Sequence, residues 1–265
     1  MTREKKTVYY EDLLNDEFSG TNIKRVPLGD NYVYAPTGIF HRMFSWFLYW
    51  VIAYPLIFLF LKIGYHVRVS GKKNRKYLRG QGIFVYGNHS QIIDALTGQV
   101  FGMQHKRGYI VCNQDTTSIK GVRWLVNMLG AIPTPENPRE AEQYKACIFR
   151  RIKQKRGIVI FPEAHIWPYS THIRPFGDES FSFPAELGAP VIAMAMTYRR
   201  RRFLKYHRPY VTLHLSKPIY PDMHLSLPER KKELRDRVYE YLLDKVNEED
   251  NYEYVRYVKK KNIED

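Results

Sequence analysis

Acidic residues are scarce in this chain, and so is cysteine. Its 265 residues include 27 Asp and Glu against 42 Lys and Arg, giving a formal net charge of +15. Such an excess narrows the binding partners to anionic ones, namely nucleic acid, anionic lipid headgroups or a phosphorylated substrate. The two cysteines, Cys112 and Cys147, have no metal-like spacing, so neither a disulfide framework nor a zinc site is indicated.

Several signatures of catalysis and cofactor binding are absent as well. The sequence contains no G-x-S-x-G, P-loop, H-E-x-x-H or G-x-G-x-x-G, so no enzyme nucleophile, metal or cofactor is implied. It also lacks RNA-recognition and helix-turn-helix patterns, which argues against nucleic acid as a partner. With 44% hydrophobic residues, the chain can still bury a substantial core.

The longest uncharged stretch covers residues 43–61. As a helix it would be about 28 Å long, close to the ~30 Å hydrocarbon core of a bilayer, and Pro55 is expected to kink it. A membrane span, a helix lying in one leaflet and a buried soluble helix all stay open. Seven Lys or Arg and no acid lie between Lys62 and Arg79, which predicts that the chain is cytoplasmic beyond the apolar stretch. We therefore expect a membrane-associated helix over residues 39–64, with anionic membrane lipids as partners.

Short apolar runs alternate with helical patterns from residue 65 to residue 250. This alternation predicts an α/β fold, a mostly parallel sheet flanked by helices, in one undivided domain behind the membrane-associated helix. Residues 1–38 are predicted to form an irregular N-terminal arm, and residues 251–265 a basic C-terminal tail. Strands are expected at 83–86, 108–112, 157–161, 190–196 and 210–215, and helices at 91–103, 118–129, 141–155 and from a capping box at 226–229.

Residues with acid–base chemistry come after the first of these strands. His89 lies just beyond it, and Asp94 lies five positions further on. Five residues of an ideal helix rotate by about 500°, which would leave the two side chains roughly 140° apart around the helix. They can therefore meet only if His89 lies in the turn and Asp94 on the next helix. A carboxylate on one imidazole nitrogen leaves the other as a base. Glu163 follows the strand at 157–161 in a similar way. The alternative is a surface His and a helix Asp that do not meet.

Four ordered blocks carry a family resemblance. They are the N-H-x4-D pattern at 88–94, the Leu-Gly-Ala-Ile at 129–132, the Phe-Pro-Glu at 161–163, and the paired elements at 175–181 and 188–192. Together, over roughly 82–196, they resemble the glycerolipid acyltransferases, the family of 1-acylglycerol-3-phosphate acyltransferases. The resemblance implies transfer of a fatty acyl group from acyl-CoA or acyl carrier protein to a lipid hydroxyl in phospholipid biosynthesis. It implies His89 as general base, Asp94 as its orienting carboxylate, and substrate-binding roles for Asn88 and Glu163.

Two departures from the family pattern concern the acceptor. Ile166 stands where the family has an arginine that meets the acceptor phosphate, and Ile132 is followed by prolines where the second block has its arginine. Bidentate arginine contacts are what select a phosphate. We expect Arg139 or Arg174 to substitute, with Arg174 favoured because it lies eleven residues after Glu163. The alternative is an acceptor without a phosphomonoester.

Two other classes of function also fit parts of the sequence. The same His89 and Asp94 pair could activate water, which would make the protein an acyl-thioester or lipid hydrolase. A non-enzymatic basic protein that binds nucleic acid or tethers membranes is the second, and the basic cluster at 199–208 fits contact with an anionic surface. The oligomeric state, the acyl chain length and the identity of the donor are not encoded in recognisable motifs.

Overall fold

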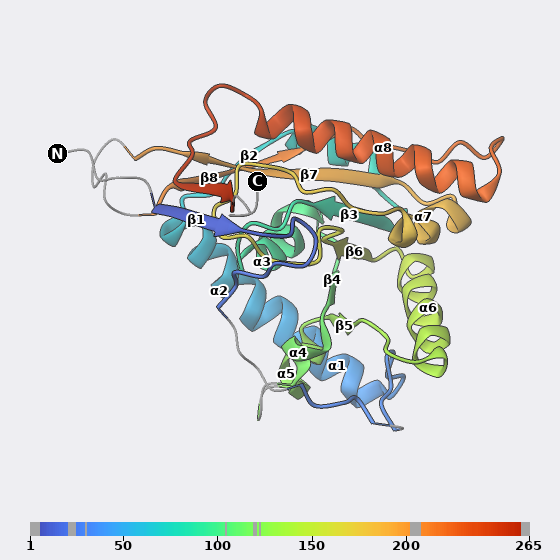
Figure 1. The fold of residues 1–265 in the computed structure, drawn as a ribbon. Helices are drawn as coiled ribbons and strands as arrows, with labels where there is room; N and C mark the ends of the chain where they lie inside the picture. Colours follow the sequence, from blue (N-terminus) through green and yellow to red (C-terminus); the bar gives the residue numbers. More distant parts are fainter. Residues whose placement is uncertain are drawn as a thin grey trace.

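A seven-stranded sheet forms the centre of the molecule, with the strand order β2-β8-β7-β3-β6-β4-β5 (Figure 1). The computed structural model describes residues 6–20, 25–29, 31–103, 105–118, 121, 123–201 and 208–260. Neighbouring strands run parallel except for β7 and β8, which confirms the predicted mostly parallel α/β sheet. The strands are β2 (Arg68–Ser70), β3 (Ile83–Gly87), β4 (Gly108–Cys112), β5 (Ala131–Pro133), β6 (Gly157–Ile160), β7 (Val191–Arg199) and β8 (Tyr210–Leu215).

Helices cover both faces of this sheet, so its side chains enter two separate core layers. Phe84 and Tyr86 of β3 pack in the layer that contains α6 (Pro138–Lys153), α7 (Ser182–Leu187) and α8 (Leu227–Val246). Ile83 and Val85 point the other way, into a layer with residues of η4 (Gly98–Gly102) and the N-terminal helix. Burial on both faces explains why these strands read as continuous apolar runs.

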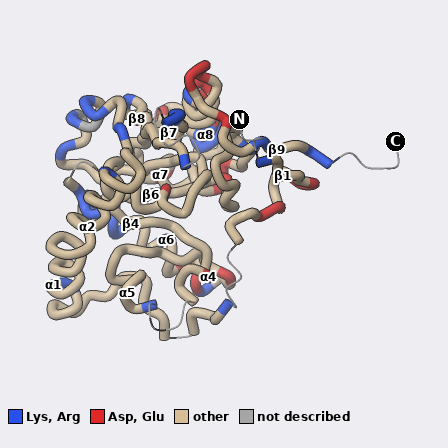
Figure 2. The backbone as a smooth tube through the Cα atoms, turned by 90° about the vertical axis from the view of Figure 1, so that its left-hand side faces the viewer, with Lys and Arg blue, Asp and Glu red and all other residues tan. Residues whose placement is uncertain are grey.

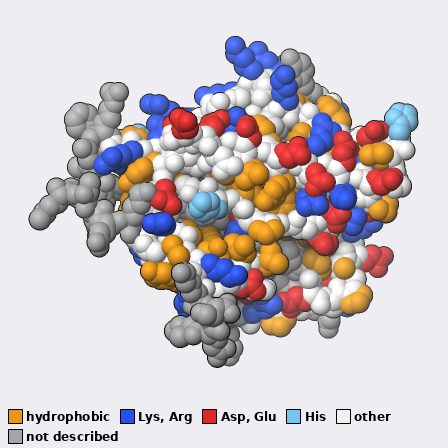
Figure 3. All heavy atoms as spheres, turned by 45° about the horizontal axis from the view of Figure 1, so that its top comes forward, with side chains coloured by type: hydrophobic (Ala, Val, Ile, Leu, Met, Phe, Trp, Pro, Cys, Tyr) orange, Lys and Arg blue, Asp and Glu red, His pale blue; other side chains and the backbone are white. Residues whose placement is uncertain are grey.

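Capping and periodicity explain the two long helices of the first layer. Asn137 accepts a hydrogen bond from the Glu140 amide at the start of α6, and the predicted capping box of Ser226 and Glu229 opens α8. One stripe of α8 is buried, and its outer face carries charges of both signs, interspersed as Figure 3 shows. The buried stripe consists of Leu234, Val238, Leu242 and Val246.

The N-terminal apolar segment is one continuous helix over Ile39–Gly64. It passes through α1 (Ile39–Phe47), η1 (Leu48–Ala53), α2 (Tyr54–Leu59) and η2 (Phe60–Gly64), of which η1 and η2 are π-helical. Pro55 has no amide hydrogen to donate, and the wider turns of η1 precede it. Ser45, Tyr49 and Leu61 are buried against the domain, while most of the remaining side chains are exposed and apolar.

Two helices differ from the sequence prediction. The helix expected at 91–103 begins only at Asp94, with α3 (Asp94–Thr97) continuing into η4. Of the helix expected at 118–129, the structure has only α5 (Arg123–Met128), and residues 119, 120 and 122 lie outside the described residues. A separate short helix, α4 (Gln114–Thr117), ends before the expected range, and Gly121 between the two has a φ of 77° that favours glycine. The strands β2 and β5 and the short helices η3 (Lys72–Leu78), η5 (Glu179–Phe181) and α7 were not predicted, because segments this short show no period.

Both ends of the chain form a second, two-stranded sheet. β1 (Lys6–Tyr10) pairs in parallel with β9 (Val255–Lys259), although these residues were predicted as an irregular arm and a basic tail. This small sheet packs on Trp167, whose ring stacks on Tyr257 at a centroid distance of 4.8 Å. Strand pairing between residues so far apart in sequence leaves no local signal.

Lysine and arginine are unevenly distributed over the fold. Figure 2 shows them gathered around α2, β4 and β8, whereas Asp and Glu lie near β1, α4 and α8. In the predicted basic cluster at 199–208, residues 202–207 lie outside the described residues. Its described arginines stack on aromatic rings: the guanidinium carbon of Arg208 lies 3.9 Å from the ring centre of Tyr65, and that of Arg201 lies 4.4 Å from that of Tyr210.

Candidate active site

The candidate site lies where β3 and β6 end. These two strands are parallel neighbours, so their carboxyl ends meet at the same edge of the sheet. His89 follows the end of β3 by two residues, and Glu163 follows the end of β6 by three. The carboxyl edge of a parallel sheet is where such folds place their chemistry. The topology therefore brings the two sequence-predicted blocks together.

His89 and Asp94 are in contact. The Nδ1 atom of His89 lies 3.2 Å from the Asp94 Oδ2 atom, with His89 in the turn and Asp94 opening α3. The same carboxylate oxygen accepts hydrogen bonds from the amides of Ser90 at 2.6 Å and Gln91 at 2.7 Å. Burial raises the pKa of the fully buried Asp94 carboxyl, and the hydrogen bonds from His89 and the two amides oppose that rise. Asp94 thus holds both the imidazole and the turn that carries it.

The other ring nitrogen of His89 is available. The imidazole stacks on Phe161 with a centroid distance of 4.3 Å and an interplanar angle of 14°. With Nδ1 donating to Asp94, Nε2 is the acceptor nitrogen, and it forms no hydrogen bond with any residue that the structure describes. The side chain is 14% exposed. An imidazole held in this way can take a proton from a hydroxyl group that approaches Nε2.

Glu163 contacts the backbone of the turn that carries His89. Its Oε2 atom accepts hydrogen bonds from the His89 amide at 3.5 Å and from the Arg174 side chain at 3.1 and 3.3 Å. Burial raises the pKa of Glu163 to about 7, and the positive charge of Arg174 opposes the rise. Glu163 therefore links the end of β6 to the backbone of the His89 turn.

Arg174 is buried within this arrangement. It is 2% exposed, and its guanidinium contacts Glu163, the carbonyl oxygen of His165 and the ring of Trp167, 5.1 Å from that ring's centre. Its Nη1 atom is buried and has no hydrogen-bond partner among the described residues. The predicted contact of Arg174 with an acceptor phosphate stays a prediction. What the structure shows is an internal ion pair with Glu163.

Asn88 and Arg139, the other two predicted substrate-binding residues, have different surroundings. The Asn88 side chain accepts from the Met196 amide at 2.8 Å and donates to the Met196 carbonyl at 3.2 Å, which ties the end of β3 to β7. Arg139 is exposed in the first turn of α6. That helix follows β5, an edge strand separated from β3 by β6 and β4.

Several contacts in the site could not be found from the sequence. Tyr198 of β7 donates a hydrogen bond to the Ser90 hydroxyl at 2.7 Å, and the Trp167 amide donates to the His89 carbonyl at 3.2 Å. Both depend on which segments become neighbours, which no motif records. Ala164 does carry a local signal: it stands where the resembled block has glycine, and its φ is 62°, a left-handed value that disfavours alanine.

Comparisons with known proteins show a family and a fold to which this chain is similar. Residues 66–197 match the family model described as Acyltransferase, a range that includes His89, Asp94, Glu163 and Arg174. The fold is similar to that of the 1-acyl-sn-glycerophosphate (LPA) acyltransferase PlsC from Thermotoga maritima, with a TM-score of 0.56 and 19% identity. This likeness covers 79% of this chain and 88% of that one and shows a shared fold. No curated protein sequence matches the chain significantly.

Proposed function

Because this chain belongs to the acyltransferase family, we propose that it moves a fatty acyl group from acyl-CoA or acyl carrier protein to a hydroxyl of a lysophospholipid or related glycerolipid. Nε2 of His89 takes the proton of the acceptor hydroxyl as its oxygen attacks the thioester carbonyl. The carbon–sulfur bond then breaks, an ester forms, and the thiolate leaves with the proton from His89. Asp94 holds the imidazole in the required tautomer.

One observation carries this proposal. The imidazole of His89 is fixed by a buried carboxylate through Nδ1, while Nε2 is left without a partner among the described residues. The same arrangement activates the serine of a catalytic triad, and here the substrate would supply the hydroxyl. The structural relative's name, a 1-acyl-sn-glycerophosphate acyltransferase, supports a glycerolipid as the acceptor.

We also propose that the protein works at a membrane surface. The helix over Ile39–Gly64 is long and apolar enough to cross a bilayer, yet it contacts the domain near its start, middle and end, through Ser45, Tyr49 and Leu61. A true span would draw the attached domain into the hydrocarbon, where its buried Arg107, bonded to Ser45, would be costly. A helix lying in one leaflet avoids that cost, because the attached domain then stays outside the hydrocarbon.

Product analysis with matched histidine variants tests the reaction. The full chain would be incubated with labelled acyl-CoA, with and without lysophosphatidate or monoacylglycerol, and the products identified by mass spectrometry. We expect an acylated glycerolipid, and His89→Ala to lower kcat/KM by about 10²- to 10⁴-fold. His224→Ala, at an exposed histidine in the turn before α8, serves as the control and should leave the rate unchanged. Equal release of fatty acid with and without acceptor would instead identify a hydrolase.

A further inference from the structure

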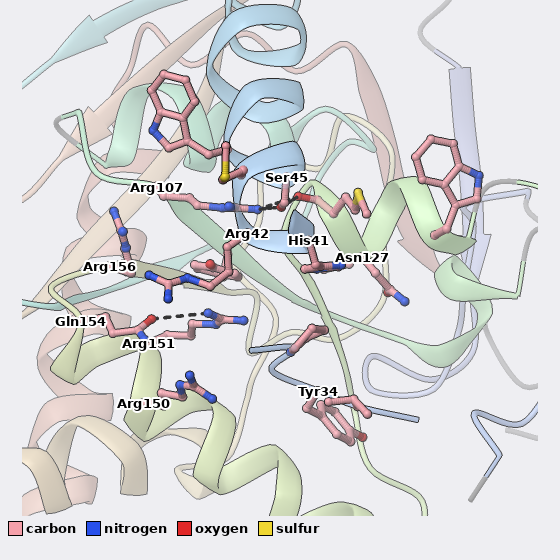
Figure 4. A pocket seen from close by; sticks show the side chains of 18 of the residues that line it. Tyr34, His41, Arg42, Ser45, Arg107, Asn127, Arg150, Arg151, Gln154 and Arg156 are labelled. Atoms are coloured by element: carbon pink, nitrogen blue, oxygen red, sulfur yellow. Dashed lines mark hydrogen bonds between the residues drawn. The ribbon is translucent and has the colours of Figure 1, made fainter. Parts of the chain in front are cut away.

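A cavity lies at the amino ends of the strands, at the edge of the sheet opposite to His89. Its volume is about 1050 Å³, and it lies between α1, α5, the start of β4 and the end of α6. Figure 4 shows arginine side chains from several of these elements grouped on one side of it. We call this cavity the arginine pocket, after the five arginines that line it: Arg42, Arg107, Arg150, Arg151 and Arg156.

The positive charge of the arginine pocket is not neutralised from within. No Asp or Glu is among the described residues that line it. The side chains of Arg42 and Arg156 form no hydrogen bond or ion pair within the part of the chain that the structure describes. The Nε atoms of Arg107 and Arg151 are buried and also lack partners there. Guanidinium groups without carboxylates favour an anion, and a phosphate fits their planar geometry especially well.

Arg107 shows that the site is built rather than a loose surface cluster. This side chain is only 9% exposed, and it donates to the Ser45 hydroxyl at 2.5 Å and to the Met128 carbonyl at 2.6 Å. Its guanidinium carbon lies 5.2 Å from the ring centres of both Tyr49 and Tyr109. Burial lowers the pKa of Arg107, and repulsion from Arg151 and Arg156 adds to that effect.

The arginine pocket is separate from the candidate active site. Arg107 and Arg156 directly precede β4 and β6, whose first residues, Gly108 and Gly157, pair with each other, and Gly157 also pairs with Ile83. These positions mark the amino ends of the strands. His89 lies six residues beyond Ile83, which at the rise of a strand is about 20 Å along the sheet.

The apolar part of the lining of the arginine pocket indicates what kind of anion would bind. It includes Ile39, Met43 and Trp46 of α1, the helix that also carries Arg42, and these three are 65%, 63% and 55% exposed. The same helix continues as the exposed apolar surface of residues 39–64. A ligand that placed a phosphate among the arginines would therefore have an apolar surface beside it, which suits an amphiphile.

We propose that the arginine pocket binds the phosphate group of an anionic membrane phospholipid, with its acyl chains lying along α1. Such a site would hold the protein at the membrane by a specific headgroup contact in addition to the insertion of the helix. It is independent of the transfer reaction, so failure of either proposal leaves the other standing.

Binding of a soluble short-chain lipid tests this proposal. Isothermal titration of the full chain with monomeric dihexanoyl phosphatidylglycerol at 0.15 M salt should give saturable binding with one lipid per protein. Arg42→Ala/Arg156→Ala should weaken it at least tenfold. These two side chains have no described partners, so the variant should fold, which an unchanged melting temperature would confirm. Lys217→Ala/Lys232→Ala removes the same charge at two exposed lysines elsewhere and should bind as the original chain does.

Control ligands and the two variants together test both the nature of the ligand and the site. Dihexanoyl phosphatidylcholine, which has no net charge, and glycerol phosphate, which has no acyl chains, should each bind at least tenfold more weakly. Glycerol phosphate binding as tightly as the lipid would overturn the lipid assignment in favour of a soluble phosphate. Equal loss in the arginine and lysine variants, or no loss in either, would overturn the site itself.

Discussion

Replacing Arg174 with methionine should destabilise the protein in a pH-dependent way. Methionine keeps an unbranched apolar stem of similar reach but removes the cation that lies 3.1 Å from Glu163. Breaking a buried ion pair by removing one partner typically costs about 3–5 kcal/mol, because the other charge is left unpaired in a poor solvent. Protonation of Glu163 removes this cost because it neutralises the unpaired charge, so the cost depends on pH.

The size of the pH effect is set by the pKa of Glu163. Its folded value of about 7 lies above the ordinary 4.5, so the folded state binds more protons than the unfolded state between these values. Stability therefore falls as the pH rises from 4.5 to about 7, by at most ~3 kcal/mol, and is then level for this group. Without Arg174 the folded pKa rises further, and stability continues to fall by about 1.4 kcal/mol per pH unit above 7. Between pH 6 and pH 8.5, Arg174→Met should lose about 2 kcal/mol more than the original chain does.

Urea unfolding at pH 6 and pH 8.5 measures this difference. The same Arg174→Met change in a Glu163→Gln background is the control, because glutamine does not titrate there. In that background, Arg174→Met should change the free energy of unfolding by the same amount at pH 6 and at pH 8.5. If Arg174→Met in the original background also costs the same at pH 6 and pH 8.5, Arg174 does not neutralise Glu163. The reasoning from the ion pair would then be refuted, and the contact with an acceptor phosphate would become the stronger explanation of Arg174.

Three other changes have defined outcomes. Asp94→Asn should lower kcat/KM less than His89→Ala does, because an amide still contacts the imidazole but no longer stabilises its charged form; kinetics showing a larger loss would contradict the orienting role. Ala164→Gly should raise the free energy of unfolding by about 0.5–1 kcal/mol, since relief of the left-handed strain exceeds the added freedom of the unfolded chain; denaturant melts would show no gain if the turn is unstrained. A wash with 1 M salt should leave the protein on membranes, because salt screens charges but not apolar insertion; release of most of it would exclude an inserted helix.

The buried strands were predictable because local sequence decides them. The runs at β3, β4 and β6 are apolar and each begins at or just after a glycine, and the expected ranges agree with the structure to within one residue. The capping box and buried stripe of α8 were predictable for the same reason. The sequence predicted that His89 and Asp94 can meet only if His89 lies in a turn and Asp94 on the following helix. The structure has this arrangement.

Contacts between distant segments were not predictable. Pairing of β1 with β9 joins the two ends of the chain. The two hydrogen bonds between the Asn88 side chain and the Met196 backbone depend on β7 lying beside β3. The arginine pocket likewise gathers residues from α1, α6 and the loops before β4 and β6. Each arginine by itself reads as a solvated charge. Arg174 reads as a free cation near Glu163 until the fold shows it buried against that carboxylate.

The position of the N-terminal helix suggests how a lipid would reach His89. Tyr54 of α2 donates a hydrogen bond to the Val100 carbonyl of η4 at 3.5 Å, and Phe58 packs against Phe101. η4 is the direct continuation of α3, the helix that Asp94 opens. Ile92, between His89 and Asp94 in the sequence, is 63% exposed despite being apolar. A helix lying in one leaflet would thus bring the turn of His89 and Asp94 against the same lipid surface, so an acceptor could enter from within the leaflet without first crossing water.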